Sequence, residues 1–383
     1  MKETLLRMGS YLLVAMLATV LTLTMVHLEV GLRPSKLDQL EALIADKFIE
    51  DADSEKLADA AAAAMVKATG DRWSYYIPAS EYEAYIEQSE NAYVGVGMTI
   101  QAEEDGSGFL IVAVVPGGPA EEAGIQIKDL LIRVDETDIR AMTAEEVRDL
   151  VKGEEGTTVS LTVLRQGTSE TLYVPRRRVE TPVATYEMLE GNIGLVTIEN
   201  FDDRCAKESI AAIETLLKNG AEKLIFDVRH NPGGFASELV ELLDYLLPEG
   251  DLFRTVRYDG QEHVDTSDAD CLEIPMAVLV NASSYSAAEF FAAALREYEV
   301  AVIVGEETVG KGYFQSTYQL SDGSAVALSI GKYFTPKGVS LAEDGLTPDV
   351  VVPVEDDVAL EIYYGTLAAQ QDPQIQAAIK ALN

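Results

Sequence analysis

Short apolar runs recur through the C-terminal half of the chain, and segments of a different character separate them. The runs have the length of a strand and are too short for a helix: Asn192–Ile198, Lys223–Arg229, Ile274–Val280 and Val300–Val304. Between them lie segments that are rich in helix formers and contain no Gly or Pro, namely Ala206–Lys218 and Ser286–Leu295. Strands that alternate with helices in this way predict an α/β core.

Residues 91–176 show a second pattern, in which short strands alternate with turns and short helices. Thr143–Val151 is a helix that opens with a Thr-x-x-Glu capping box. The other elements are the strand Leu110–Val115, the turn and short helix Pro116–Gly124, the strand Asp129–Asp135 and a final alternating strand, Thr158–Leu164. This ordered set resembles a PDZ domain. The resemblance implies a carboxylate-binding loop in Tyr93–Gly97, with backbone N–H groups supplied by Val94, Gly95, Val96 and Gly97.

The N-terminal part of the chain predicts an anchor followed by a helical arm. Ser10–Leu28 carries no formal charge and is long enough to cross a bilayer. A cleaved secretory signal is the alternative, but no Ala-x-Ala-like site precedes Val30, so we expect one uncleaved transmembrane helix. Basic residues flank the run on both sides, so the positive-inside count does not fix its orientation. Pro34–Thr69 is acidic and Ala-rich, which is typical of a helical packing arm.

Composition and charge narrow the range of partners. The chain has 383 residues and a formal net charge of −36. This charge disfavours nucleic acids and anionic lipid surfaces as partners, and we expect it to disfavour acidic tails as substrates. The histidines His27, His230 and His263 show no metal-ligand spacing, and the sequence predicts no metal and no other cofactor. Cys205 and Cys271 would permit a disulfide outside the cytoplasm, which the sequence leaves open.

A candidate nucleophile, Ser286, lies where the run Ile274–Val280 gives way to a helix. A hydroxyl is lifted from the backbone at such a junction, and the free N–H groups of the first helical turn face whatever it attacks. The alternative is that Ser283, Ser284 and Ser286 only cap the helix. Further along, Lys311 stands between two glycines that let the backbone bend its side chain inward. A Lys in an apolar site loses proton affinity and can act as a base, whereas in an ordinary loop it is simply solvated.

The order Asn281-x-x-Ser-x-Ser-Ala-x-Glu289, followed by Gly310-Lys-Gly-x-x-Gln315, resembles the carboxyl-terminal processing peptidases, also called tail-specific proteases. The resemblance implies that Ser286 is the nucleophile, that Lys311 is its base and that Gln315 orients Lys311. It also implies an oxyanion hole, in which the N–H of Ala287 acts together with that of Gly233 or Gly234. Glu289 is expected to be a structural partner for a buried cation or for backbone groups.

The same resemblance implies a crotonase-like α/β protease core with an inserted PDZ domain. The uncharged run and the Ala-rich segment add one N-terminal transmembrane helix and a helical N-terminal arm to this architecture. The expected divisions are residues 1–9 for a cytoplasmic tail, 10–28 for the anchor, 29–90 for the arm and the start of the core, 91–176 for the PDZ domain, 177–354 for the protease core and 355–383 for a helical tail. We expect a single-pass protein of the cell membrane with its catalytic part outside the cytoplasm. Its substrates would be polypeptides with free C-termini, and such arms help to form homodimers in the family.

Three alternatives stay open on the sequence alone. His230 could be the base of a Ser–His pair, although no Asp lies beside it in a recognisable motif. The chain could be a non-catalytic PDZ scaffold with a relic protease core. The paired glycine and helix turns could also belong to an enzyme acting on acyl-CoA, but the sequence contains no basic stripe for the phosphates of that cofactor.

Overall fold

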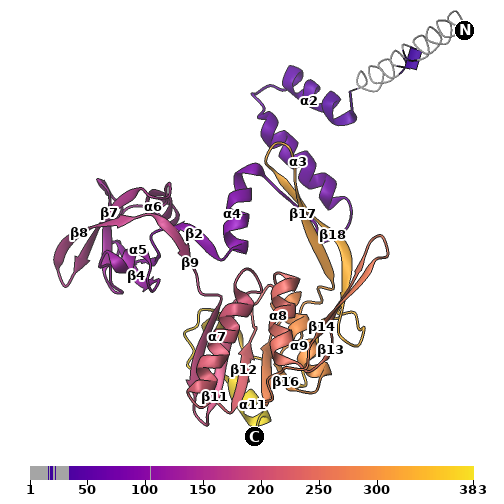
Figure 1. Ribbon diagram of the computed structural model, residues 1–383. Helices are drawn as coiled ribbons and strands as arrows, with labels where there is room; N and C mark the ends of the chain where they lie inside the picture. Colours follow the sequence, from indigo (N-terminus) through magenta and orange to yellow (C-terminus); the bar gives the residue numbers. More distant parts are fainter. Residues whose placement is uncertain (1–15, 17, 20–21, 23–33, 104) are drawn as a thin grey trace, which may run out of the picture. The chain divides into compact units, whose positions relative to one another are not determined.

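The computed structural model describes residues 16, 18–19, 22, 34–103 and 105–383, which Figure 1 shows as a ribbon. The predicted anchor, residues 10–28, lies outside the described residues except at Met16, Ala18, Thr19 and Thr22. None of the described helices is both long enough and apolar enough to span a bilayer. The chain divides into two units, residues 1–78 and 79–383.

The helical arm in the first unit is interrupted, where the sequence predicts one helical segment. α2 (Lys36–Lys47) begins after Ser35, whose hydroxyl accepts the N–H of Asp38 in a capping box. α3 (Ser54–Lys67) begins after Asp53, whose carboxylate caps its first turn. The short strand β1 (Tyr75–Ile77) follows. Two separately capped helices therefore replace the continuous arm, because each cap residue starts a new helix.

The core of the second unit is a six-stranded sheet with the strand order β10-β11-β12-β15-β16-β19. β10 is antiparallel to β11, and all other neighbours are parallel. The strands are β10 (Ala184–Leu189), β11 (Ile193–Ile198), β12 (Lys223–Asp227), β15 (Met276–Val280), β16 (Ala301–Gly305) and β19 (Val350–Val351). The four apolar runs of the sequence are thus confirmed as the central strands of an α/β sheet.

Helices cover both faces of this sheet. Side chains of Phe226 and Val278 pack in one cluster with α7 (Cys205–Lys218), α8 (Ala236–Leu246) and α9 (Ala287–Glu297). Side chains of Ile225 and Ala277 point the other way and pack against α11 (Pro373–Ala381). Because successive strand residues face opposite layers, β15 is buried at every position. The helical tail packs on the core, and α10 (Asp356–Tyr363) precedes it.

Antiparallel strands continue beyond the helical layer. β18 pairs with both β17 and β13, and β13 pairs with β14. These strands are β13 (Gly250–Arg257), β14 (Glu262–Ser267), β17 (Tyr313–Gln319) and β18 (Ala325–Phe334). The β13–β14 hairpin has no counterpart among the elements expected from the sequence. Lys311 lies just ahead of β17, so this layer fixes where the loop of Lys311 ends.

A separate sheet, with the order β3-β4-β5-β7-β8, forms after α4 (Ala79–Ser89), and β6 pairs with β5. Its elements are β3 (Met98–Ala102), β4 (Phe109–Val114), α5 (Pro119–Glu122), β5 (Leu130–Val134), β6 (Thr137–Asp138), α6 (Ala144–Val151), β7 (Thr158–Arg165) and β8 (Thr168–Pro175). The chain enters and leaves through the paired strands β2 (Ala92–Gly95) and β9 (Arg177–Glu180). The expected final strand, β7, is followed by β8 through a hairpin at Gln166 and Gly167, whose φ values of 50° and 82° suit a two-residue turn.

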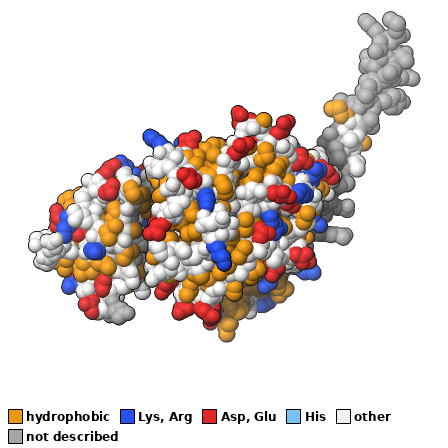
Figure 2. All heavy atoms as spheres, turned by 90° about the horizontal axis from the view of Figure 1, so that it is seen from below, with side chains coloured by type: hydrophobic (Ala, Val, Ile, Leu, Met, Phe, Trp, Pro, Cys, Tyr) orange, Lys and Arg blue, Asp and Glu red, His pale blue; other side chains and the backbone are white. Residues whose placement is uncertain are grey.

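The surface carries the acidic excess without a single-signed patch on the face shown in Figure 2, where acidic and basic side chains are scattered among apolar ones. Both cysteines are free: Cys205 is buried and Cys271 is half-buried. The disulfide that the sequence left open is therefore not formed in this structure.

Candidate active site

Ser286 occupies a strained turn between β15 and α9. Its backbone has φ 59° and ψ −126°, a conformation that residues with a Cβ rarely adopt. α9 begins at the next residue, Ala287, so the turn delivers Ser286 to the N-terminal end of a helix, as the sequence predicts. The residue is only 5% exposed. A backbone held in this way needs strong local support.

Part of the support comes from the other polar residues of the same turn. The hydroxyl of Ser284 donates to the carbonyl of Val228 (2.7 Å) and accepts the N–H of Asn281 (3.0 Å). The side-chain oxygen of Asn281 accepts the N–H of Ser283 (3.1 Å). Ser284 is fully buried and Ser283 is exposed. Ser284 therefore stabilises the turn and ties it to the end of β12, and neither serine shares the position of Ser286 at the helix end.

Glu289 provides the rest of the support and joins two distant segments. Its Oε2 accepts the backbone N–H of Ser286 (2.8 Å) and of Lys311 (2.9 Å). Its Oε1 accepts the backbone N–H of Gly310 (2.8 Å) and the hydroxyl of Thr308. The side chain is completely buried, and no ion pair of the described residues includes it. Four donors thus replace water around a buried charge, and one carboxylate holds both the Ser286 turn and the Lys311 loop.

The Lys311 loop depends on the glycines on either side of it. A Cβ added at Gly310 would lie 2.8 Å from a backbone nitrogen of residues 342–345, and one at Gly312 would lie 2.7 Å from another. The two glycines therefore permit a close approach of two chain segments, as the sequence suggests. The half-buried Lys311 has its Nζ 5.6 Å from the centre of the Tyr285 ring. This arrangement brings the lysine beside the residue that precedes Ser286.

Gln315 lies on β17, directly opposite Ser329 of β18. Its Nε2 donates to the hydroxyl of Ser329 (2.9 Å) and more weakly to the carbonyl of Tyr313 (3.3 Å). The structure therefore places the amide nitrogen of Gln315 on its neighbouring strand. That Gln315 orients Lys311 stays a prediction. Ser329 carried no signal in the sequence, because its role depends on the register of two strands.

The glycine turn after β12 lies directly against Ser286. A Cβ added at Gly233 would lie 2.7 Å from the Cβ of Ser286 and 2.8 Å from the nitrogen of Ala287. The N–H of Gly233 donates to the side chain of Asn231 (2.8 Å). Within the described part of the chain, the N–H groups of Gly234 and Ala287 have no such acceptor. Of the two glycines that the sequence offers as oxyanion donors, Gly234 is thus the one with an unused N–H.

His230 is turned toward other partners. Its Nε2 accepts from the side-chain amide of Asn281 (2.9 Å), and its ring lies edge-on to Tyr363, with 5.1 Å between the ring centres. Burial lowers the pKa of His230 below its ordinary value, and the neighbouring charge of Arg229 lowers it further. A neutral imidazole whose acceptor nitrogen is occupied by Asn281 is poorly placed to take a proton from Ser286.

Asp202 is an ionisable group beside the glycine turn that sequence reasoning missed. A Cβ at Gly234 would lie 2.6 Å from the backbone nitrogen of Asp202. Burial raises the pKa of Asp202 to about 7, and the charge of Glu238 adds to the shift. The group follows Phe201 in an irregular segment, so only the fold shows that it adjoins Gly234. It would titrate in the pH range in which a protease is assayed.

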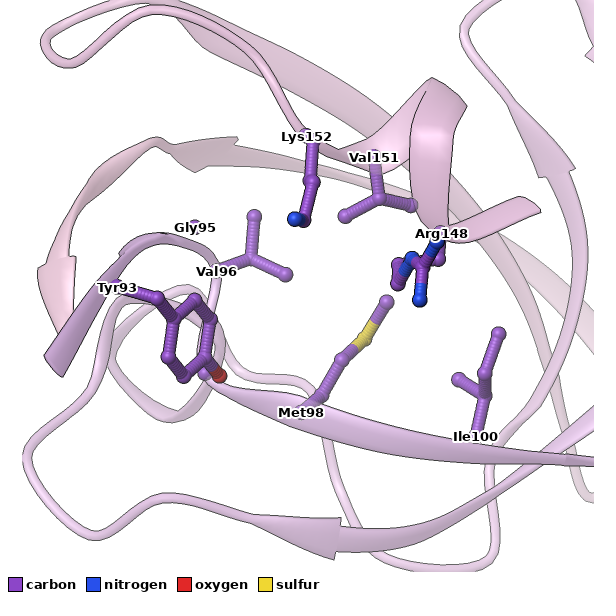
Figure 3. Close-up of a pocket in the computed structure, with 9 residues that line it drawn as sticks. Tyr93, Gly95, Val96, Met98, Ile100, Arg148, Val151 and Lys152 are labelled. Carbon is purple, nitrogen blue, oxygen red and sulfur yellow. The ribbon is translucent and has the colours of Figure 1, made fainter. Parts of the chain in front are cut away.

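A groove between β3 and α6 contains the glycine loop expected to bind a chain-end carboxylate. The cavity has a volume of about 310 Å³ and is lined by Tyr93, Gly95, Val96, Gly97, Met98, Ile100, Arg148, Val151 and Lys152. Figure 3 shows the side chains of Tyr93, Met98 and Arg148 around it. Val94 is not among these residues, and its N–H donates to Glu87 (3.2 Å). The structure thus brings three of the four predicted loop residues to the groove.

Comparison with known proteins first defines the class. Residues 192–352 match the profile of "Peptidase family S41", and residues 110–165 match that of a PDZ domain. The carboxy-terminal processing protease CtpA of Bacillus subtilis is 32% identical over 324 residues, which cover 84% of this chain and 69% of the relative. A probable CtpA-like serine protease of Staphylococcus saprophyticus is 30% identical over 350 residues, covering 88% and 70%.

The chain therefore belongs to the carboxy-terminal processing proteases of peptidase family S41, serine proteases that carry a PDZ domain. A putative S41 protease from Bacteroides fragilis has a TM-score of 0.56 at 18% identity, covers 91% of this chain and 97% of its own, and supports the fold alone. Family membership confirms the resemblance drawn from the two motifs. It favours a protease over the scaffold and the acyl-CoA enzyme.

Proposed function

We propose that this chain is a membrane-anchored endopeptidase that captures C-terminal tails in its PDZ groove and cleaves them with Ser286 as nucleophile and Lys311 as base. The observation that carries the proposal is the single carboxylate of Glu289, which holds the backbone N–H of both residues. Sequence positions that lie far apart are thereby fixed at one site, beside the glycine turn and the N-terminal end of α9.

The chemistry would run as follows. The neutral amine of Lys311 takes the hydroxyl proton of Ser286 while the oxygen attacks the scissile carbonyl carbon. The resulting oxyanion accepts hydrogen bonds from the N–H groups of Ala287 and Gly234. The Lys311 ammonium then gives its proton to the leaving amine, and the C–N bond breaks to leave an ester on Ser286. The same amine then takes a proton from water while the water oxygen attacks the ester carbon. The Lys311 ammonium returns that proton to the Ser286 oxygen as the C–O bond breaks, which releases the acid product and restores both residues. Gln315 is proposed to orient Lys311, as the family resemblance implies.

The division of the chain follows from this proposal. Residues 91–176 would be the PDZ domain, 177–354 the protease core, and 10–28 a single anchor that places the catalytic part outside the cytoplasm. The uncharged run in residues 10–28 supports the anchor. Exposed Leu37, Leu40 and Leu43 on α2, at 43%, 53% and 57% exposure, support pairing of two arms in a homodimer.

Labelling of the purified full chain with a fluorophosphonate tests the assignment of the nucleophile. The wild type should be modified at Ser286 and should degrade an unfolded polypeptide. Ser286→Ala should neither label nor cleave, whereas Ser283→Ala, which changes an exposed serine of the same turn, should do both. A label on another residue, or cleavage by Ser286→Ala, would overturn the assignment.

Topology is tested separately on intact cells. An added protease should digest the catalytic part while the membrane is whole. Digestion that requires broken membranes would contradict the proposed location and would leave the catalytic assignment untouched.

A further inference from the structure

The groove beside the glycine loop carries charge of one sign only. Its charged lining residues are Arg148 and Lys152, which project from the last turn and the C-terminal cap of α6. In Figure 3 both basic side chains reach toward the cavity from the side opposite Met98 and Ile100 of β3. In a chain of net charge −36, a groove with two cations and no carboxylate differs from the average surface.

The same groove defines where a tail would lie. β3 is the edge strand of its sheet, so its outer edge is available to pair with an added strand. Tyr93 and Gly97 both line the cavity, so a chain-end carboxylate bound at the glycine loop would lie beside the phenol of Tyr93. A tail whose carboxylate takes that place would run antiparallel along β3. Its last side chain would lie near Met98, and its third-from-last side chain would lie on the same face, near Ile100, because strand side chains alternate.

The two cations meet different parts of such a tail. Figure 3 shows Lys152 beside the loop at Gly95 and Val96, where the carboxylate would bind. It shows Arg148 farther along, beside Met98 and Ile100. No ion pair of the described residues includes Lys152.

Arg148 is 57% exposed, and its contacts to Glu145 (3.6 Å) and Asp149 (3.4 Å) on its own helix are long. Exposed pairs of this kind contribute little and exchange readily.

We propose that Arg148 makes this groove select tails in which an acidic side chain stands third from the end, behind an apolar last residue, while Lys152 strengthens the hold on the chain-end carboxylate. The inference rests on the proposed capture of tails by the PDZ groove and names the substrate class for that site. The sequence led us to expect that the acidic surface disfavours acidic tails. That expectation does not apply inside the groove, because the charged residues that line it are basic.

Binding of short dye-labelled peptides to the full chain carrying Ser286→Ala, which prevents cleavage, tests the proposal. The peptides share an apolar last residue and differ at one position: Glu third from the end, Gln third from the end, or Glu second from the end. The first should bind about threefold more tightly than the second, the size expected of an exposed ion pair. The peptide with Glu second from the end should bind like the Gln peptide, because the side chain of that Glu would point away from α6. The preference should shrink in about 1 M salt.

Variants assign the preference to a residue. Arg148→Glu should reverse the order of the Glu and Gln peptides, whereas Arg133→Glu, an equal charge change at an exposed position outside the groove, should preserve it. Lys152→Ala should weaken all free-carboxylate peptides by a similar factor and leave their ratio unchanged. Thermal unfolding of each variant establishes that the fold is kept.

An amidated peptide distinguishes acid selection by Arg148 from the capture of tails by the groove. If an amidated peptide binds more weakly than its free acid but Glu and Gln bind alike, the selection by Arg148 is wrong and tail capture stands. If the amidated peptide binds as well as the free acid, tail capture itself is wrong.

Discussion

The Ser286 turn and the PDZ groove use their backbone N–H groups in opposite ways. At the turn, one buried carboxylate satisfies the N–H groups of Ser286, Gly310 and Lys311, while no hydrogen bond among the described residues uses the N–H groups of Gly234 and Ala287. In the groove, Val96 and Gly97 of the glycine loop line a cavity of about 310 Å³, and Arg148 is more than half exposed. The contacts that hold the turn are therefore all made within the folded protein, whereas the groove makes its characteristic contacts only when a ligand binds. Substitutions in the first region should damage the fold and the rate together, and those in the second should change affinity alone.

The largest effect is expected from Glu289→Gln. An amide offers one acceptor oxygen in place of two, and its NH₂ would face two donors, so buried N–H groups would lose their partners. Each such group costs about 1–3 kcal/mol. We expect the free energy of unfolding to fall by about 3 kcal/mol and kcat to fall by about 10² or more, because small displacements of reacting groups are costly.

Calorimetry and initial rates measure both quantities. Glu241→Gln, at an exposed position of α8, serves as the matched control and should change neither. Near wild-type activity in Glu289→Gln would remove the basis for treating this carboxylate as the support of the site.

A smaller effect is expected from Gly310→Ala, compared with Gly260→Ala. The two glycines have almost the same φ, 81° and 82°, but only Gly310 has atoms within 4 Å of the added Cβ. The shared left-handed strain should cost each variant about 1 kcal/mol. Only Gly310→Ala should also displace the Lys311 loop and lower kcat by about tenfold. Equal rates in the two variants would show that the close contact with residues 342–345 does not position Lys311.

The smallest effect is expected in the groove, where the substitution should increase the affinity for tail peptides. Tyr93→Phe removes a hydroxyl from the lining of the cavity that also contains Gly97, so a tail carboxylate would no longer compete with that hydroxyl for the N–H groups of the loop. Tail peptides should bind about threefold more tightly and KM should fall while kcat is unchanged. Tyr173→Phe, at a position 72% exposed on β8, is the control. A fall in kcat would mean that Tyr93 acts beyond the groove.

In both regions, the sequence predicted the secondary structure better than the side-chain contacts between segments that are distant in the chain. The strand, turn and helix around Ser286 follow from apolar runs and helix formers, which are local properties. The capping box of α6 was likewise predicted and is confirmed at Thr143. The four bonds of Glu289 span up to 22 residues, and a pattern of residue types does not encode them.

The misses have the same cause. The exposed strand β8 has too weak an alternation to stand out, and its hairpin turn at Gln166 and Gly167 was overlooked. Val94 appeared suited to bind a carboxylate until the fold assigned its N–H to Glu87. In each case the decisive partner lies on another element of the structure.

The most direct test of the proposed mechanism compares kcat/KM across pH for Lys311→Ala and His230→Ala. The wild-type rate should rise with pH, since only a neutral amine accepts the proton of Ser286. Burial raises the pKa of the Asp202 carboxyl, beside the glycine turn, to about 7. Asp202→Asn removes this carboxyl and therefore serves as the control for whether it, and not Lys311, causes the rise with pH. We predict that His230→Ala keeps both the rate and its rise with pH, while Lys311→Ala loses about 10²–10⁴ in rate. An inactive His230→Ala variant together with an active Lys311→Ala variant would contradict the assignment of Lys311 as the base.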